Sequence, residues 1–109
     1  MYISITGIKV KSFFKILKFM RYTVPSFTAA RKASGNLFCE SRKINKYHHT
    51  LTAWKNRYRM MDYLRGKHHS SAMKNFRSLG TGSVYGYEDD TIPSWEDAIK
   101  KWKENFKEI

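Results

Sequence analysis

The stretch at residues 50–73 constrains the fold most, because it joins a strand to a helix that breaks once and restarts. Its first five residues alternate between two faces, with Trp54 on the threonine face, as in a half-buried strand. Asn56 follows where a helix N-cap belongs, and Gly66 suits the end of a first helical piece. A second piece then turns an apolar stripe inward, which consists of His69, Ala72, Met73 and Phe76.

The first forty residues predict a strand and a long helix. Ile3 and Ile5 fall in the opposite phase to Ile8 and Val10, so we expect a bulge at Thr6-Gly7 that brings all four inward. Ser12 then precedes a helix that kinks at Pro25 and ends near Gly35. Its apolar stripe, predicted to pack on a sheet, consists of Phe13, Ile16, Leu17, Met20 and Val24.

The other segments complete one order of elements. Residues 37–42 and 47–54 alternate around a polar turn and predict a hairpin, and a fourth strand follows Gly80. A C-terminal helix is expected at residues 93–109, with Ser94 as its cap. The result is an α+β, ferredoxin-like βαββαβ fold with an antiparallel sheet and an appended C-terminal helix, in one domain over residues 1–109. Because helices cover one face of such a sheet, we expect a second copy of the chain to cover the other in a homodimer.

The charge is positive and unevenly distributed. The formal net charge of +12 divides into +15 through Tyr87 (17 Lys and Arg, two acids) and −3 from Glu88 onward (four Lys, seven acids). Such a balance favours nucleic acid, an anionic membrane face or an anionic ligand as partner. Scattered basic residues are also typical of solvated helix faces.

The sequence lacks several functional signatures. Cys39 is the only cysteine, so an intramolecular disulfide is excluded. The apolar run from Phe13 to Met20 is interrupted by lysines, so we expect neither a signal peptide nor a membrane span, and a cytoplasmic location. No serine elbow, phosphate loop or paired carboxylates are recognisable, and no metal site is expected.

In their order, five segments resemble the dimeric α+β barrel superfamily of antibiotic-biosynthesis monooxygenases, and within it the spheroidene monooxygenase-like proteins. These segments are GNLF at 35–38, TLTAW at 50–54, MMDYL at 60–64, HSSAM at 69–73 and PSWEDA at 93–98. The resemblance implies a pocket between sheet and helices and oxidation of an aromatic or isoprenoid compound without a metal. It places Trp54, Tyr63 and His69 as candidate catalytic residues lining that pocket.

No cofactor is expected from the resemblance, although haem stays open. A branch of the superfamily degrades haem with a Trp and a His on this helix, and here Tyr63 and Met73 occupy those two positions. Haem degradation of that type is therefore not implied. Binding of haem through a single imidazole such as that of His69 remains an alternative.

Four further residues are candidates for substrate binding: His49 in the third strand, Arg42 as a cation for an enolate or carboxylate, and Met60 and Met73 as a soft lining. Each candidate also has a structural interpretation. His69 could simply bond to the backbone, and the aromatic residues could simply form the core. The alternatives to a monooxygenase-like protein are therefore a nucleic-acid or anionic-surface binder and a non-catalytic dimer that binds a hydrophobic ligand.

Overall fold

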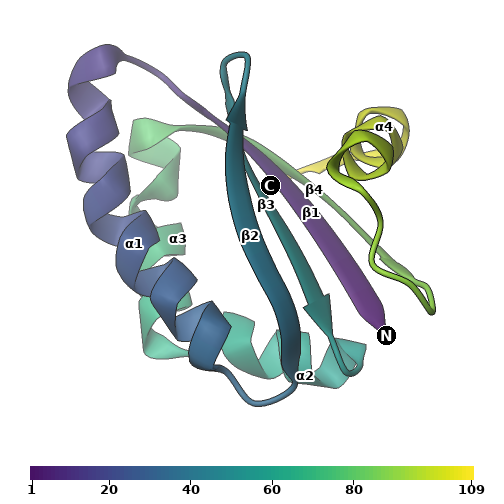
Figure 1. Cartoon of the computed structure of the whole chain (residues 1–109). Helices are drawn as coiled ribbons and strands as arrows, with labels where there is room; N and C mark the ends of the chain where they lie inside the picture. The colour runs from purple at the N-terminus through teal and green to yellow at the C-terminus, as the bar shows by residue number, and fades with distance from the viewer.

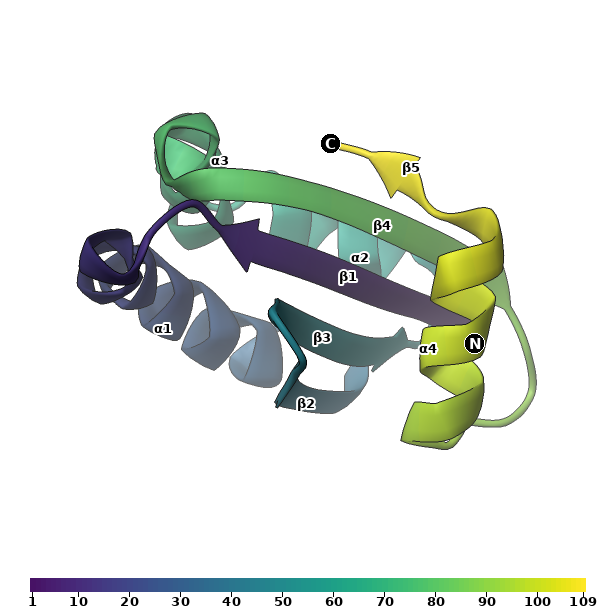
Figure 2. The same ribbon diagram turned by 90° about the horizontal axis from the view of Figure 1, so that it is seen from above.

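The computed structural model describes residues 1–76 and 78–109 and contains one antiparallel sheet with helices on both faces (Figures 1 and 2). The five strands lie in the order β2-β3-β1-β4-β5. The predicted α+β, ferredoxin-like order is confirmed. In chain order the elements are β1 (Tyr2–Val10), η1 (Phe13–Lys15), α1 (Ile16–Lys32), β2 (Asn36–Ile44), β3 (Tyr47–Trp54), α2 (Arg57–Leu64), α3 (Lys67–Leu79), β4 (Gly80–Glu88), α4 (Trp95–Asn105) and β5 (Lys107–Glu108).

The register of β1 separates the side chains into two faces. Tyr2 pairs with Trp54 and Thr6 with Thr50, whereas the intervening Ile3 pairs with Ala53. Successive side chains of a strand point to opposite faces. The Trp54 face therefore meets α1, α2 and α3, and the Ile3 face meets α4. Figures 1 and 2 show α4 on the opposite side of the sheet from the other helices.

The predicted bulge at Thr6-Gly7 is wrong. β1 pairs without interruption with both β3 and β4, so Ile8 stays on the same face as Thr6. The register shift lies instead in β2, between Asn36 and Phe38. Unbroken pairing on both sides gives the central strand no freedom to accommodate an extra residue.

The packing predicted for the first helix is also wrong. Its apolar stripe faces away from the sheet, and Phe13 and Leu17 are exposed. The buried side of α1 carries Phe19, Ser26 and Ala30 instead. Both sides of this helix carry apolar residues, so periodicity alone selected the wrong one.

The helix that breaks and restarts is confirmed. The Asn56 side chain accepts a hydrogen bond from Arg59 N at 3.0 Å, which caps α2. Gly66 separates α2 from α3, and its amide donates to Tyr63 O at 2.9 Å. A single glycine thus sets the direction of α3 relative to α2.

The C-terminal segment covers the second face of the sheet. α4 ends at Asn105 rather than continuing to residue 109, and β5 pairs with β4. Ser94 caps the helix by accepting from Asp97 N at 3.2 Å. The core under α4 is buried within one chain, so it does not require a second copy, and it consists of Ile3, Ile5, Leu51, Ala53, Ala98 and Trp102. None of the helices in the described residues combines the length and apolarity that crossing a bilayer requires.

Candidate functional site

The three candidate catalytic residues lie in one aromatic stack. The Trp54 ring at the end of β3 lies 5.3 Å from the Tyr63 ring, with 26° between their planes. The imidazole of His69 in turn meets the Tyr63 ring edge-on, at 5.3 Å and 61°. The stack therefore connects the sheet to α2 and then to α3, and the break at Gly66 brings its last two members together.

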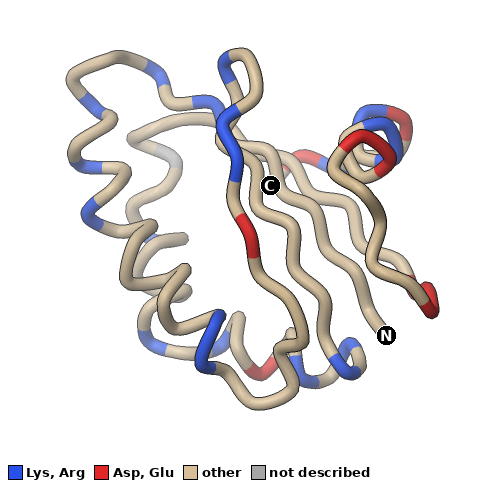
Figure 3. Tube along the Cα trace, in the orientation of Figure 1, with Lys and Arg blue, Asp and Glu red and all other residues tan. Residues whose placement is uncertain are grey.

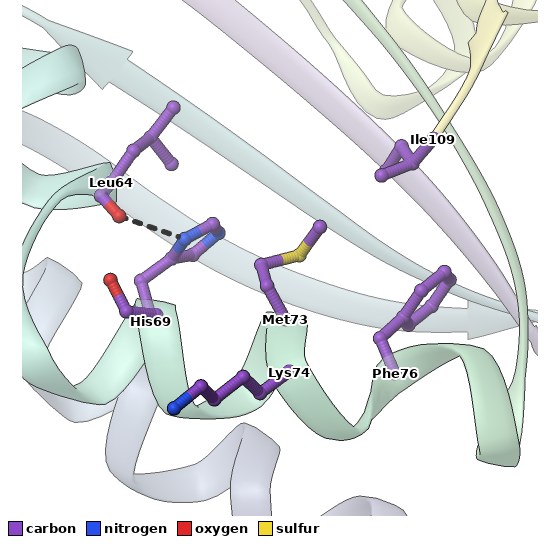
Figure 4. A pocket seen from close by; sticks show the side chains of 7 residues that line it. Leu64, His69, Met73, Lys74, Phe76 and Ile109 are labelled. Atoms are coloured by element: carbon purple, nitrogen blue, oxygen red, sulfur yellow. Dashed lines mark hydrogen bonds between the residues drawn. The ribbon is translucent and has the colours of Figure 1, made fainter.

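His69 forms part of the wall of a cavity of about 540 Å³, and Figure 4 shows the side chains around it. The volume lies within the range of small-molecule sites. Tyr63 and Trp54 lie behind the histidine and are not among the lining residues. These are Leu64, His69, Ser70, Met73, Lys74, Phe76 and Ile109.

The orientation of the imidazole defines which nitrogen can react. His69 Nδ1 lies 3.2 Å from Leu64 O, shown as the dashed line in Figure 4. A carbonyl oxygen only accepts, so Nδ1 carries the proton. In the neutral ring Nε2 then keeps its lone pair and can accept a proton. Burial lowers the pKa of His69 below 6.5, which favours this neutral form at pH 7.

Tyr63 is held in place by α1. Its hydroxyl donates to Ser26 O at 2.8 Å and lies 2.7 Å from Ser26 Oγ. Since the phenol has one proton, Ser26 Oγ donates the second bond. Burial raises the pKa of Tyr63 more than the Ser26 bond lowers it, so the phenol stays protonated at pH 7. The protonated phenol is thus fixed against α1 by its two bonds to Ser26.

Trp54 is 1% exposed, and its Nε1 makes no hydrogen bond within the described part of the chain. An unsatisfied buried donor costs about 1–3 kcal/mol, and such atoms call for a structural or functional explanation. Cys39 packs beside it in the same cluster. Burial raises the pKa of that thiol to about 11, so it is not a nucleophile at pH 7.

The candidate substrate-binding residues divide between the two sheet faces. Met73 lines the cavity with His69, and Met60 packs against the cluster of Trp54. His49 lies on the α4 face, 3% exposed, where its Nδ1 donates to Thr6 O at 3.0 Å. Arg42 also lies on that face, with its guanidinium 5.3 Å from the Trp95 ring centre. The cavity of His69 therefore includes neither His49 nor Arg42.

Sequence reasoning missed three contributors to the site. Ser26 holds Tyr63, and its spacing from Phe19 and Ala30 on one helix face was the available signal. The Leu64 carbonyl is a helix-end group, whose role follows only from the break at Gly66. Ile109 reaches the cavity because the chain turns back as β5, and a two-residue strand has no recognisable pattern.

The described residues contain no group of three or more His, Cys, Asp or Glu side chains that could hold a metal ion. If haem were to bind in this cavity, the imidazole of His69 is the lining side chain suited to be an axial ligand of its iron, through Nε2. Met73, which lies one helical turn further along α3, offers only a weak thioether ligand.

No protein-family model and no curated protein sequence matches the chain. Several solved structures, in contrast, are similar to the chain in fold. A candidate antibiotic biosynthesis monooxygenase of Nitrosomonas europaea superposes with a TM-score of 0.74 at 14% identity, over 84% of this chain and 100% of the other. One of Deinococcus radiodurans gives 0.74 at 16% identity, over 86% and 97%.

SnoaB, a cofactor-independent oxygenase of Streptomyces nogalater, gives a TM-score of 0.68 at 10% identity, over 85% of this chain and 97% of the other. Identities this low establish the fold alone. The chain thus has the α+β fold of the antibiotic-biosynthesis monooxygenase structures.

Proposed function

We propose that the protein is a cofactor-independent oxygenase of a hydrophobic phenol or quinol that binds in the 540 Å³ cavity. The observation that carries this proposal is the neutral His69 imidazole on the cavity wall, with its proton on Nδ1 and its lone pair on Nε2. The likeness to SnoaB, a cofactor-independent oxygenase, supports the same chemistry.

The reaction would start with proton transfer from the substrate hydroxyl to His69 Nε2. The resulting phenolate is electron-rich enough to pass one electron to O2, which gives superoxide and a substrate radical. These two combine at the ring carbon para to the oxygen and form a hydroperoxide. The O–O bond then breaks, the para C–H proton leaves, and the products are a quinone and one water. One phenol and one O2 thus account for all atoms.

The apolar part of the cavity lining also supports a planar aromatic ligand. Phe76 and Met73 give the cavity an apolar wall suited to a flat ring. The resemblance to spheroidene monooxygenase-like proteins adds an isoprenoid chain as the further part of the substrate.

The basic surface motivates the alternative of a nucleic-acid binder, but the fold offers it little support. A sheet that stacks bases must present open aromatic side chains. Here α4 lies over the face that carries Tyr85 and Tyr87, and both side chains pack against the core under this helix. A homodimer and a purely ligand-binding role are both compatible with the fold. The oxygen-uptake experiment below distinguishes an enzyme from a ligand carrier, and sedimentation velocity gives the oligomeric state.

Oxygen uptake with 1-naphthol, a phenol whose para position carries hydrogen, tests the proposal. We expect uptake above the uncatalysed rate, and a loss of about 10²–10⁴-fold in kcat for His69→Gln with binding retained. His68→Gln is the matched control, because His68 is the exposed neighbour on the same helix. Equal rates for wild type and His69→Gln would refute the role of His69. Binding of 1-naphthol without any oxygen uptake would indicate a ligand carrier instead.

A further inference from the structure

A row of large apolar side chains on η1 and α1 has no cover in the structure. Phe13, Phe14 and Leu17 are 81%, 89% and 82% exposed, and Met20 and Val24 are 43% and 51% exposed. We call these five residues the apolar ridge. Scattered single apolar residues are ordinary on protein surfaces, but a contiguous row of this kind marks an interaction surface.

The ridge lies on the side of the helix that faces away from the fold. Phe13, Leu17, Met20 and Val24 follow one another at spacings of four, three and four, which keeps these four on one helical face, and Phe14 lies three residues before Leu17 on its flank. Phe19 and Ala30, which are buried, lie on the opposite side and hold α1 to the rest of the molecule. The ridge can therefore be buried by a partner without any change in the fold.

The charge around the ridge is of one sign. Lys18 and Arg21 are exposed and lie beside Phe14 and Leu17 on the helix surface. Residues 1–39 contain seven Lys and Arg and no acid. Figure 3 shows basic residues along α1, whereas the acids gather mainly around α4. A partner for this surface must combine apolar material with negative charge.

We propose that the apolar ridge docks the protein on the surface of an anionic lipid bilayer. Phe and Leu side chains on one helical face enter the headgroup and acyl boundary to about 5–10 Å, while neighbouring Lys and Arg pair with anionic headgroups. The helix lies in the plane of the membrane and does not cross it. This agrees with the finding that no helix among the described residues is long and apolar enough to span a bilayer.

A second copy of the chain fits the ridge less well. A twofold pairing of two ridges would bring Lys18 and Arg21 of one copy next to the same residues of the other. Like charges in such a contact repel, and no acid within residues 1–39 compensates for them. An anionic bilayer satisfies the apolar and the charged parts together. The proposal is independent of the oxygenase chemistry, since it invokes none of the cavity residues.

Co-sedimentation with vesicles tests this docking. Vesicles of phosphatidylcholine alone are compared with vesicles that contain 30% phosphatidylglycerol, at low and at high salt. We expect binding to the anionic vesicles and a decrease at high salt, because surface charges are screened there. A single-stranded RNA oligonucleotide serves as a competitor. Displacement of the vesicles by the RNA, or equal binding to both vesicle types, would contradict the proposal.

Variants identify the surface that binds. Phe13→Gln, Phe14→Gln and Leu17→Gln together should weaken vesicle binding at least about 100-fold, because each apolar side chain contributes on burial. Leu37→Gln with Tyr58→Gln is the matched control, since both residues are exposed apolar groups elsewhere. Lys18→Gln with Arg21→Gln should weaken binding about 25-fold, at roughly 5-fold for each charge. Lys46→Gln with Lys55→Gln is the control for charge.

The oligomeric state distinguishes docking on lipid from the other explanation of the ridge, a contact between two copies of the chain. Sedimentation velocity of wild type and of the triple ridge variant is measured without lipid. If wild type is a dimer and the triple variant a monomer, and anionic vesicles fail to bind wild type, the ridge is a contact between copies and the proposal is overturned. An unchanged oligomeric state with lost vesicle binding supports docking on lipid. Circular dichroism of the variant confirms that the fold is retained.

Discussion

Each face of the sheet carries a cluster of one histidine, one tyrosine and one tryptophan. On the face of α2 and α3, His69 meets Tyr63 at 5.3 Å, and Trp54 lies beyond it. On the face of α4, His49 meets Trp102 at 4.8 Å and Tyr47 at 5.8 Å. Both imidazoles donate Nδ1 to a backbone carbonyl, and burial lowers both pKa values.

The difference between the two histidines is access. His69 borders the 540 Å³ cavity, whereas His49 is 3% exposed. Tyr47 and Trp102 border another hollow of about 440 Å³, but His49 is not among its lining residues. A buried imidazole with a lowered pKa is therefore not itself a sign of catalysis. We interpret the group around His49 as structural and the group around His69 as the reactive one.

Substitution of Trp102 should produce the largest effect, because it fills the core under α4. We expect Trp102→Ala to lower the free energy of unfolding by about 3–5 kcal/mol, measured by urea denaturation. Trp95→Ala is the control, since Trp95 is only half-buried on the same helix. A loss below about 1 kcal/mol for Trp102→Ala would contradict a structural role for this face.

Gly7 tests how closely the α4 face is packed. A Cβ at this position would overlap the Trp102 ring and lie 3.0 Å from His49 Cε1. We expect Gly7→Ala to cost about 1–3 kcal/mol of unfolding free energy, through overpacking. In a Trp102→Ala background the same substitution should cost little, because the obstructing ring is gone. Equal costs in both backgrounds would show that the indole is not the cause.

The two tryptophans differ in their hydrogen bonds, and phenylalanine substitutions expose the difference. Trp102 Nε1 donates to Ser83 O at 3.3 Å, whereas Trp54 Nε1 has no partner in the described chain. We expect Trp102→Phe to cost about 1 kcal/mol more unfolding free energy than Trp54→Phe. Urea denaturation of both variants provides the comparison. The reverse order would indicate that Trp54 Nε1 is satisfied in solution.

The pH dependence of stability tests whether the two faces are independent. Since the folded pKa values of His49 and His69 lie below 6.5, the unfolded chain binds more protons below that pH. Stability should therefore be complete above pH 6.5 and decrease as the pH falls from there. His49→Asn and His69→Asn should each flatten the decrease, and their effects should add within about 0.5 kcal/mol. Strong non-additivity would mean that the two groups are coupled through the sheet.

Local signals were sufficient to predict much of the fold. Asn56 and Gly66 place the start and the break of the paired helices, because caps and glycines act within one helical turn. The family resemblance placed Trp54, Tyr63 and His69 together at one pocket; the structure brings them into one stack, of which His69 borders the cavity. Whether they catalyse a reaction stays a prediction.

The predictions that were wrong concern features that depend on contacts between residues far apart in the sequence. α1 has apolar residues on two sides, and only the docking of Phe19 and Ala30 decides which side is buried. Strand alternation puts His49 and Trp54 on opposite faces, but it could not tell which of the two faces borders the cavity. The position of α4 across the sheet, which buries Ile3 and Ile5 within one chain, has no local signature either.

The single glycine between α2 and α3 has an evolutionary consequence. Tyr63 lies three residues before Gly66 and His69 lies three residues after it. The backbone angles at Gly66 therefore influence where the His69 imidazole lies relative to Tyr63. An added Cβ there would lie 3.0 Å from Tyr63 O, which leaves little tolerance for other residues. In a diverged homologue, a change of backbone angles at this one position would reorient the imidazole toward a different ligand, while the sheet and the helices stay as they are.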